Sequence, residues 1–195
     1  IAKVLSEFIR DNAPGLQILI HRDRDYLSED EVTQFKEAYA KQSLDVFVTA
    51  GTDAESHFLD VAHLIEVSGL DEATVTGLLE TVTGEVRDDS LGTFSREEMR
   101  RAKEARRAEN KPGEPNPHEI SEACKAAFDG DPARYRHGKK TLKALRRLIS
   151  EQHGAQPDLL AASTHLSNPV LTEFAGRLPA TTANEDEPVA ETTEE

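Results

Sequence analysis

Two aspartates and a glutamate follow the two segments of the sequence that are apolar enough to form buried strands. Asp23 and Asp25 come shortly after the apolar run Leu16–Ile20. Glu55 comes shortly after a second run, Leu44–Thr49. Side chains two residues apart in an extended chain point the same way, so the two aspartates should face together. Because carboxylates are the hard oxygen ligands that Mg²⁺ and Mn²⁺ prefer, we predict a divalent-metal site of Asp23, Asp25 and Glu55.

One or two divalent ions at such a site could activate water and stabilise the leaving oxygen of a phosphodiester. Arg22 and Arg24 alternate with the aspartates, so they should face the opposite side, where they could contact phosphate groups. A simpler interpretation also stays open, in which the aspartates cap the next helix or form salt bridges with these arginines.

A phosphatase of the haloacid-dehalogenase kind also places a D-x-D after an apolar strand. Its first aspartate would be the nucleophile and its second the general acid. That pattern has the first aspartate directly after the apolar run, whereas His21 and Arg22 intervene here. It also has a Thr or Val where this sequence has Leu27. We therefore rank this function below metal-dependent hydrolysis.

The predicted order of elements brings these acids to one edge of a parallel sheet. An amphipathic helix over 1–12 precedes the first strand, Ser28 and Glu31 form a capping box for a second helix, and a third helix covers about 53–67 after the second strand. This alternation is typical of a parallel α/β sheet, which binds ligands beyond the carboxyl ends of its strands. Two strands alone cannot form such a sheet, so we expect further strands upstream of Ile1, in a longer protein of which this is a C-terminal part.

After Gly69 the strand signals stop. The sequence predicts helices over 71–86, 95–109, 117–128 and 139–152, with one or two short helices in 155–178. Ser95 and Glu98 form a second capping box, which predicts a helix start at that point. We therefore predict an α/β domain at 1–69, a helical extension at 70–178 and a disordered acidic tail at 179–195.

The net charge of −14 is unevenly distributed. The segment 134–147 contains seven basic residues and no acid, and such a stripe can meet a phosphate backbone even on an acidic protein. A solvated helix face is the plainer alternative. The candidate nucleic-acid contacts are Arg22, Arg24, Arg136, Lys139, Lys140 and Lys143.

The sequence contains neither a membrane-spanning run of about 18 apolar residues nor a signal peptide. Its single cysteine, Cys124, excludes an internal disulfide and a cysteine zinc site. We expect a cytoplasmic protein with no membrane partner.

Three segments resemble parts of OLD-family ATP-dependent nucleases. "ILIHRDRDYLSEDEV" resembles the D-x-D segment of their TOPRIM domain, and "LDVFVTAGTDAESHFLD" resembles the next strand with its acidic E-x-E-N-Y-L-L-like helix start, on whose acids Asp53 and Glu55 fall. "YRHGKKTLKALRRLI" resembles a Gly-Lys before an amphipathic helix, and Lys139 falls on that lysine. The match covers about 1–68 and 134–150. It departs from the family at Ser56 and His57, and in lacking the metal-binding glutamate of the first TOPRIM strand.

The resemblance implies a metal-dependent endonuclease in anti-phage defence, which would cut DNA in preference to RNA and form homo-oligomers. Asp23, Asp25 and Glu55 would bind Mg²⁺ or Mn²⁺, and Lys139 would hold the scissile phosphate. ATP would bind only to an upstream ATPase domain of the ABC type. The alternative is a catalytically degenerate TOPRIM-like module for oligomerisation or for docking a separate effector protein, with 70–178 as its interface.

Overall fold

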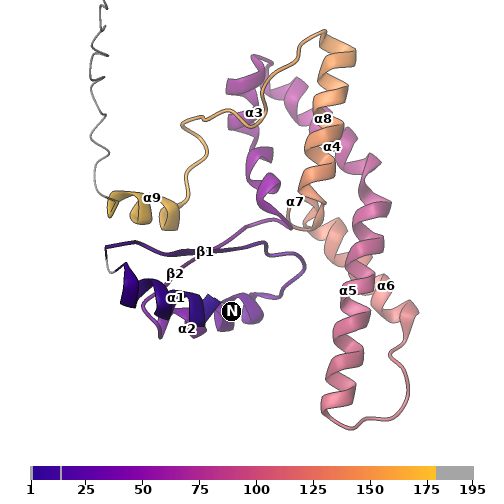
Figure 1. Cartoon of the computed structure of the whole chain (residues 1–195). Coiled ribbons are helices and arrows are strands. Elements are labelled where there is room, and N and C mark those ends of the chain that lie inside the picture. The colour runs from indigo at the N-terminus through magenta and orange to yellow at the C-terminus, as the bar shows by residue number, and fades with distance from the viewer. Residues whose placement is uncertain (1, 14, 179–195) are drawn as a thin grey trace, which may run out of the picture.

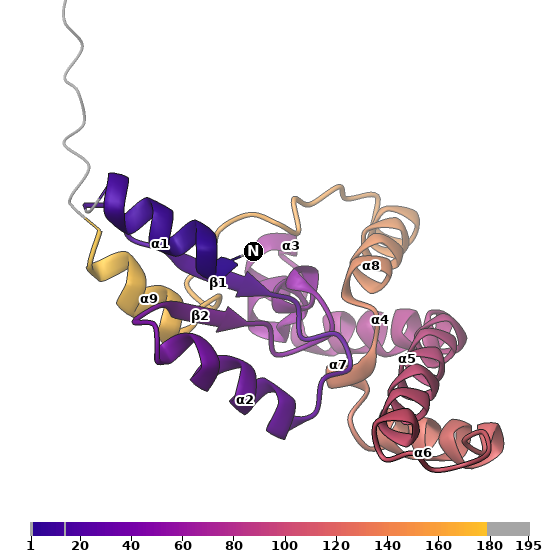
Figure 2. The same cartoon turned by 60° about the horizontal axis from the view of Figure 1, so that its bottom comes forward.

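Two short parallel strands and a larger group of helices make up the chain in the computed structural model, which describes residues 2–13 and 15–178. Strand β1 (Leu19–Arg22) pairs with β2 (Asp45–Val48), with Arg22 opposite Val48. Helices α1 (Ala2–Asn12) and α2 (Glu29–Ala40) flank the strands (Figures 1 and 2). The predicted disordered tail at 179–195 lies outside the described residues.

The remaining helices form a mostly helical second half, as predicted. None of the helices in the described part of the chain is long and apolar enough to cross a membrane. After a short 3-10 helix, η1 (Ala54–Leu59), the helices are α3 (Val61–Ser68), α4 (Glu72–Glu85), α5 (Arg87–Ala108), α6 (Pro117–Gly130), α7 (Pro132–Tyr135), α8 (Gly138–His153) and α9 (Pro169–Gly176).

The capping box that starts α2 is present as predicted. The Ser28 hydroxyl accepts from the Glu31 N–H at 3.2 Å, and the Glu31 carboxylate accepts from the Ser28 N–H at 2.7 Å. The same pattern at Ser95 was a wrong prediction, because Ser95 lies in the middle of α5. The helix passes through this point because Leu91 and Phe94 form part of its buried face.

Two further boundaries differ from the prediction. Strand β1 begins at Leu19 and continues through Arg22, so the strand ends directly before Asp23. The single helix predicted over 53–67 is divided into η1 and α3, because the Asp60 carboxylate accepts the His63 N–H at 2.9 Å and caps a new helix there.

Most of the buried apolar residues form one large core between α3, α4 and α8 and a smaller one between α5 and α6. Leu64, Val82 and Leu145, each no more than 1% exposed, lie in the larger core. Tyr26, from the loop after β1, stacks on Phe94 of α5 in the smaller core. Both cores therefore lie outside the strands, and the loop after β1 is anchored to the helices.

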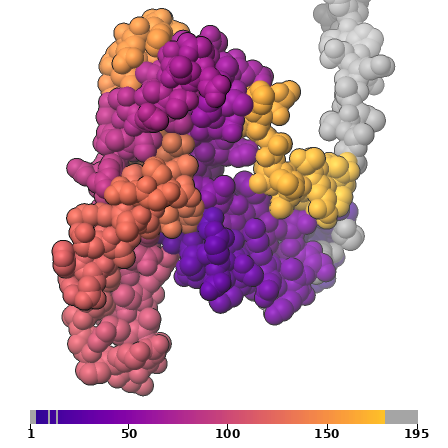
Figure 3. Space-filling model, turned by 180° about the vertical axis from the view of Figure 1, so that it is seen from behind, coloured from indigo at the N-terminus to yellow at the C-terminus, as the bar shows by residue number. Residues whose placement is uncertain are grey.

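The contacts of the strands cross the predicted boundary at residue 69. Helix α9 packs against β2, and Arg177 forms an ion pair with Asp45 at 2.6 Å. In the space-filling view α9 lies against the strand half of the molecule (Figure 3). In contrast, the apolar face of α1 is uncovered in the described structure: Val4 is 69% exposed and Phe8 62%.

Candidate functional site

A cavity of about 350 Å³ lies beyond the carboxyl ends of the two strands. Its walls come from the loop after β1, the loop after β2 with η1, the middle of α5 and the segment entering α8. All four residues predicted for catalysis line it: Asp23, Asp25, Glu55 and Lys139. The other lining residues are Tyr26, Thr52, Asp53, Thr93 and His137. We call this space the acidic cavity.

The loops that follow the two strands are hydrogen-bonded to each other, which fixes the direction of the aspartates. The Asp25 N–H donates to the Thr52 carbonyl at 2.8 Å, and the Arg24 N–H donates to the Thr49 hydroxyl at 2.8 Å. Asp25 has a φ of 48°, in the left-handed region that aspartate and asparagine tolerate best among non-glycine residues. Such backbone persists only where surrounding structure holds it, and it clusters at functional sites.

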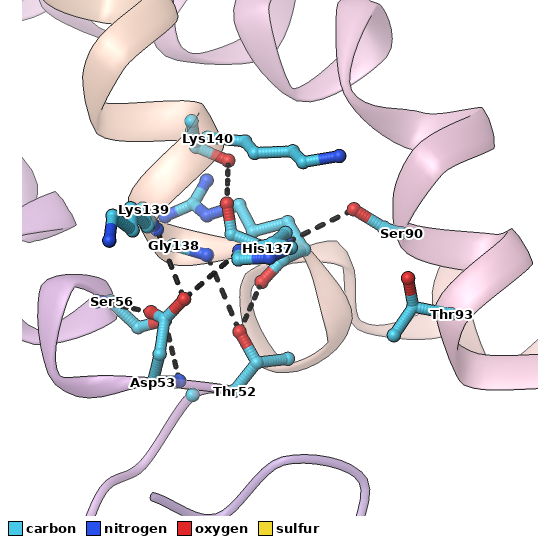
Figure 4. A network of polar contacts seen from close by, with 12 residues as sticks. Thr52, Asp53, Ser56, Ser90, Thr93, His137, Gly138, Lys139 and Lys140 are labelled. Atoms are coloured by element: carbon cyan, nitrogen blue, oxygen red, sulfur yellow. Dashed lines mark hydrogen bonds and ion pairs between the residues drawn. The ribbon is translucent and has the colours of Figure 1, made fainter. Parts of the chain in front are cut away.

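Asp53 joins the loop after β2 to the start of α8 (Figure 4). Its Oδ1 accepts from the Ser56 N–H at 3.1 Å and from the Ser56 hydroxyl at 2.8 Å. Its Oδ2 accepts from the Lys139 N–H at 3.1 Å and lies 3.1 Å from His137 Nδ1. A Cβ on Gly138 would collide with Asp53 Oδ1, so only glycine permits this approach. We call this contact the Asp53 junction.

Three further hydrogen bonds extend the junction, and one of them reaches α5 (Figure 4). The Thr52 hydroxyl donates to the Arg136 carbonyl at 2.9 Å and accepts from the Gly138 N–H at 3.3 Å. The His137 N–H donates to the Ser90 hydroxyl at 3.0 Å. The backbone of the Gly-Lys segment is therefore fixed from both sides, and this places Lys139 at the rim of the acidic cavity.

The carboxylates of the acidic cavity repel one another. Burial, and then the neighbouring Asp23 carboxylate, raise the pKa of Asp25 above its ordinary value of 3.8, while Arg22 opposes this effect. Asp23 Oδ1 is buried and accepts no hydrogen bond from the described residues, although His21 Nε2 lies 3.4 Å away. A cation beside these two aspartates would relieve the repulsion.

The side chains suit a hard divalent cation in type, but they do not form a closed cage. Within residues 2–13 and 15–178, no group of three or more His, Cys, Asp or Glu side chains is gathered closely enough to hold a metal ion. Mg²⁺, however, is usually bound by one or two carboxylates and completes its shell with water and substrate phosphates. Asp23 and Asp25 fit an open site of this kind, and Glu55 of η1 lines the same cavity.

The predicted basic contacts divide into exposed and structural residues. Arg136 is only 8% exposed, and its guanidinium donates to the Thr83 hydroxyl at 3.2 Å and the Leu59 carbonyl at 3.4 Å. Burial also lowers its pKa. Arg136 therefore holds the helices together and does not present its charge to a ligand at the surface.

The other basic candidates differ in the side-chain contacts that they already form within the protein. Arg22 lies over the Phe35 ring of α2, 4.4 Å from its centroid, and Arg24 forms an ion pair with Glu29. Lys140 pairs with Asp89 at 2.8 Å. Lys139 and Lys143 are exposed, and no described side chain forms an ion pair with either.

Four residues that line the cavity were not predicted as site residues: Tyr26, Thr52, Thr93 and His137. Thr93 belongs to the segment 70–133, which no motif linked to the strands. His137 directly precedes Gly138 and Lys139, and this adjacency was the signal that could have identified it. Asp53 entered only through the family resemblance, and its place in the junction could not be read from local sequence.

The end of β1 at Arg22 also affects the phosphatase alternative. Asp23 follows the strand directly, so the two residues that separated it from the apolar run belong to the strand. One of the two sequence arguments against that alternative is thereby removed. The argument from Leu27 stands.

Comparisons with known proteins add no family to this geometry: no family model matches the chain, and neither a curated protein nor a solved structure is significantly similar to it.

Proposed function

We propose that the chain is a divalent-metal-dependent endonuclease module that hydrolyses phosphodiester bonds, with DNA as its preferred substrate. The observation that carries the proposal is the convergence of Asp23, Asp25, Glu55 and Lys139 on one cavity from three separate parts of the chain. Three carboxylates and one lysine are the groups that such a reaction needs: oxygen ligands for a cation and a positive charge for the phosphate.

In this proposal Asp23 and Asp25 hold Mg²⁺ or Mn²⁺, and Glu55, which lines the same cavity, orients a water molecule. A bound ion would supply Lewis-acid stabilisation of the phosphate and of the leaving oxygen. Lys139, whose backbone the Asp53 junction fixes, places its ammonium group against the scissile phosphate. The bound ion would neutralise the mutually repelling carboxylates and so allow the negatively charged phosphate to enter the cavity. Binding of the ion should therefore strengthen binding of the phosphate, and the reverse.

The test is cleavage of plasmid DNA by the purified chain in the presence of Mg²⁺ or Mn²⁺, with EDTA as the control. The Asp23→Asn and Asp25→Asn variants should lose cleavage while keeping the fold. If both variants cut as fast as the parent chain, the assignment is wrong. We propose further that the module belongs to an OLD-like ATPase-nuclease in anti-phage defence, and its ATP dependence can be tested only in a protein that includes the ATPase.

A second candidate function is a catalytically degenerate module that docks a second copy or an effector protein. The absence of a three-ligand group among the described residues and the uncovered apolar face of α1 favour it. This function requires that the chain bind no Mn²⁺ in calorimetry and that it self-associate or capture a partner. Mn²⁺ binding that disappears in the Asp23→Asn variant would argue against it.

The phosphatase alternative makes a separate prediction at the same residue. A nucleophilic Asp23 would form an aspartyl-phosphate that can be trapped after incubation with a phosphomonoester. A metal-ligand role for Asp23 predicts no such adduct.

A further inference from the structure

The exposed face of α8 presents three basic side chains in one row. Lys139, Lys143 and Arg146 are separated by four and three residues, so they lie on the same side of the helix. At 1.5 Å per residue the row extends over about 10 Å along the helix axis. All three are exposed, whereas the opposite face of α8, with Leu142 and Leu145, is buried in the larger core.

The row differs from its basic neighbours on the same helix in having no ion-pair partners among the described residues. Lys140 pairs with Asp89 of α5 at 2.8 Å, and Arg147 pairs with Glu85 of α4 at 2.7 Å. These two pairs fasten α8 to the helices beside it. In the part of the chain that the structure describes, no acidic side chain forms such a pair with Lys139, Lys143 or Arg146.

The two ends of the row lead to two different depressions in the surface. Lys139 lines the acidic cavity at the start of α8. Lys143 and Arg146 line a groove of about 530 Å³ between the second half of α8 and the segment that follows it. The remaining residues of the groove are Arg147, Ser150, Gln156, Pro157 and Asp158. Asp158 is the only acid among the described residues that line it, and its Oδ1 accepts the Leu160 N–H at 3.0 Å.

We propose that Lys139, Lys143 and Arg146 form a track for the phosphate backbone of a nucleic acid, which enters over the groove and reaches the acidic cavity at Lys139. We call this row the α8 track. The proposal rests on the proposed function, because it specifies how the substrate of that site approaches it. The row would bind a polyanion at several points. Phosphates that precede the scissile one contact the Lys143 and Arg146 side chains, and the scissile phosphate contacts Lys139 at the acidic cavity.

The test is DNA binding by the full 195-residue chain, measured by fluorescence anisotropy with a short labelled duplex in EDTA over a range of salt concentrations. Each phosphate contact contributes about −0.9 to the slope of log K against log salt. The double variant Lys143→Gln/Arg146→Gln should therefore reduce the steepness of that slope by about 2 and weaken binding at low salt. Its thermal unfolding should match the parent chain, because neither side chain forms an ion pair with a described residue.

The matched control removes the same charge at two paired basic residues outside the groove and the acidic cavity. The Arg87→Gln/Lys125→Gln variant should change the slope by less than about 0.5, because its two side chains already pair with Asp129 and Glu122. If both double variants reduced the steepness of the slope equally, binding would depend on overall charge, and the track would be overturned. An unchanged slope for Lys143→Gln/Arg146→Gln would overturn it as well.

Two further measurements, DNA cleavage and vesicle binding, distinguish the α8 track from the proposed nuclease function and from a membrane-binding surface. If the parent chain binds DNA along the track but never cleaves it with Mg²⁺ or Mn²⁺, the proposed function fails and the track stands. If the chain cleaves DNA and the slope does not depend on Lys143 and Arg146, the function stands and the track fails. Tighter binding to vesicles of phosphatidylserine and phosphatidylcholine than to DNA, lost in the same double variant, would assign the row to a membrane surface and overturn the proposal.

Discussion

Two aspartates of the acidic cavity have opposite tasks, and their hydrogen bonds distinguish them. Asp53 accepts from two groups of Ser56 and from the Lys139 N–H, so both of its oxygens are engaged. The Asp25 carboxylate accepts no such bond from the described residues, and its pKa is raised. We infer that Asp53 is a structural residue and that Asp25 is available to a ligand.

Substitution by asparagine separates these two tasks. Asp25→Asn keeps a residue that tolerates the left-handed backbone and removes a repelled charge, so the melting temperature should stay the same or rise slightly. Cleavage should fall by more than about 100-fold, since even outer partners of a metal site cost 10–100-fold. Asp53→Asn should instead lower the free energy of unfolding by about 1 kcal/mol or more, because the amide NH₂ group cannot replace Oδ2 as the acceptor for the Lys139 N–H. Melting curves that rank the two variants the other way would contradict these assignments.

Tyr26 allows a prediction about alkaline pH. Burial, and then Asp25 and Asp53, raise the pKa of its phenol to about 12. In the unfolded chain the phenol ionises near 10, so between pH 10 and 12 the folded state keeps a proton that the unfolded state has lost. The free energy of unfolding should therefore decrease as pH rises through this window. The Tyr26→Phe variant should lose part of this decrease in denaturant titrations, while Tyr39→Phe should retain it.

At the scale of elements, the site depends on one close approach between a loop and a helix. Gly138 lies where any Cβ would collide with Asp53 Oδ1, and the Ser56 nitrogen would be 2.5 Å away. The glycine is therefore needed for packing at the first residue of α8. The first turn of α8 and the loop after β2 must move together.

Gly138→Ala should consequently open the Asp53 junction. We expect a loss of about 1–3 kcal/mol in the free energy of unfolding, as in other overpacked sites, and a larger loss of cleavage because Lys139 is displaced. The control is Gly92→Ala in α5, where an added Cβ meets nothing within 4 Å. That variant should be stabilised by about 0.4–1 kcal/mol and should cut normally. Normal cleavage by Gly138→Ala would remove the junction from the mechanism.

The helices and strands also show which sequence patterns are sufficient to predict the structure. The same Ser-x-x-Glu pattern occurs at Ser28, where it starts α2, and at Ser95, where α5 simply continues. The pattern is local, and at Ser95 the burial of Leu91 and Phe94 outweighs it. The structure brings the strand-end acids to one cavity, as the parallel pairing implied by the order of elements predicts. The role of Asp53 could not be predicted, because its partner Gly138 is 85 positions away and no sequence period connects them.

At the scale of the whole molecule, the strands contribute the acids, but the helices hold them in place. Both strands contain four residues, and both apolar cores lie outside them. The loop after β1 reaches the smaller core through Tyr26, and the loop after β2 reaches α8 through the Asp53 junction. The acidic cavity should therefore keep its shape only while the helical core is folded.

This dependence predicts that core stability and cleavage are lost together. Leu145→Ala, at a side chain 1% exposed in the larger core, should lower the free energy of unfolding by about 2–5 kcal/mol. Phe8→Ala on α1, where the side chain is 62% exposed, should change it by less than about 0.5 kcal/mol. As temperature rises, helical circular dichroism and DNA cleavage should be lost at the same midpoint in each variant. A Leu145→Ala chain that loses its helical signal yet continues to cut would mean that the strand half holds the acidic cavity by itself.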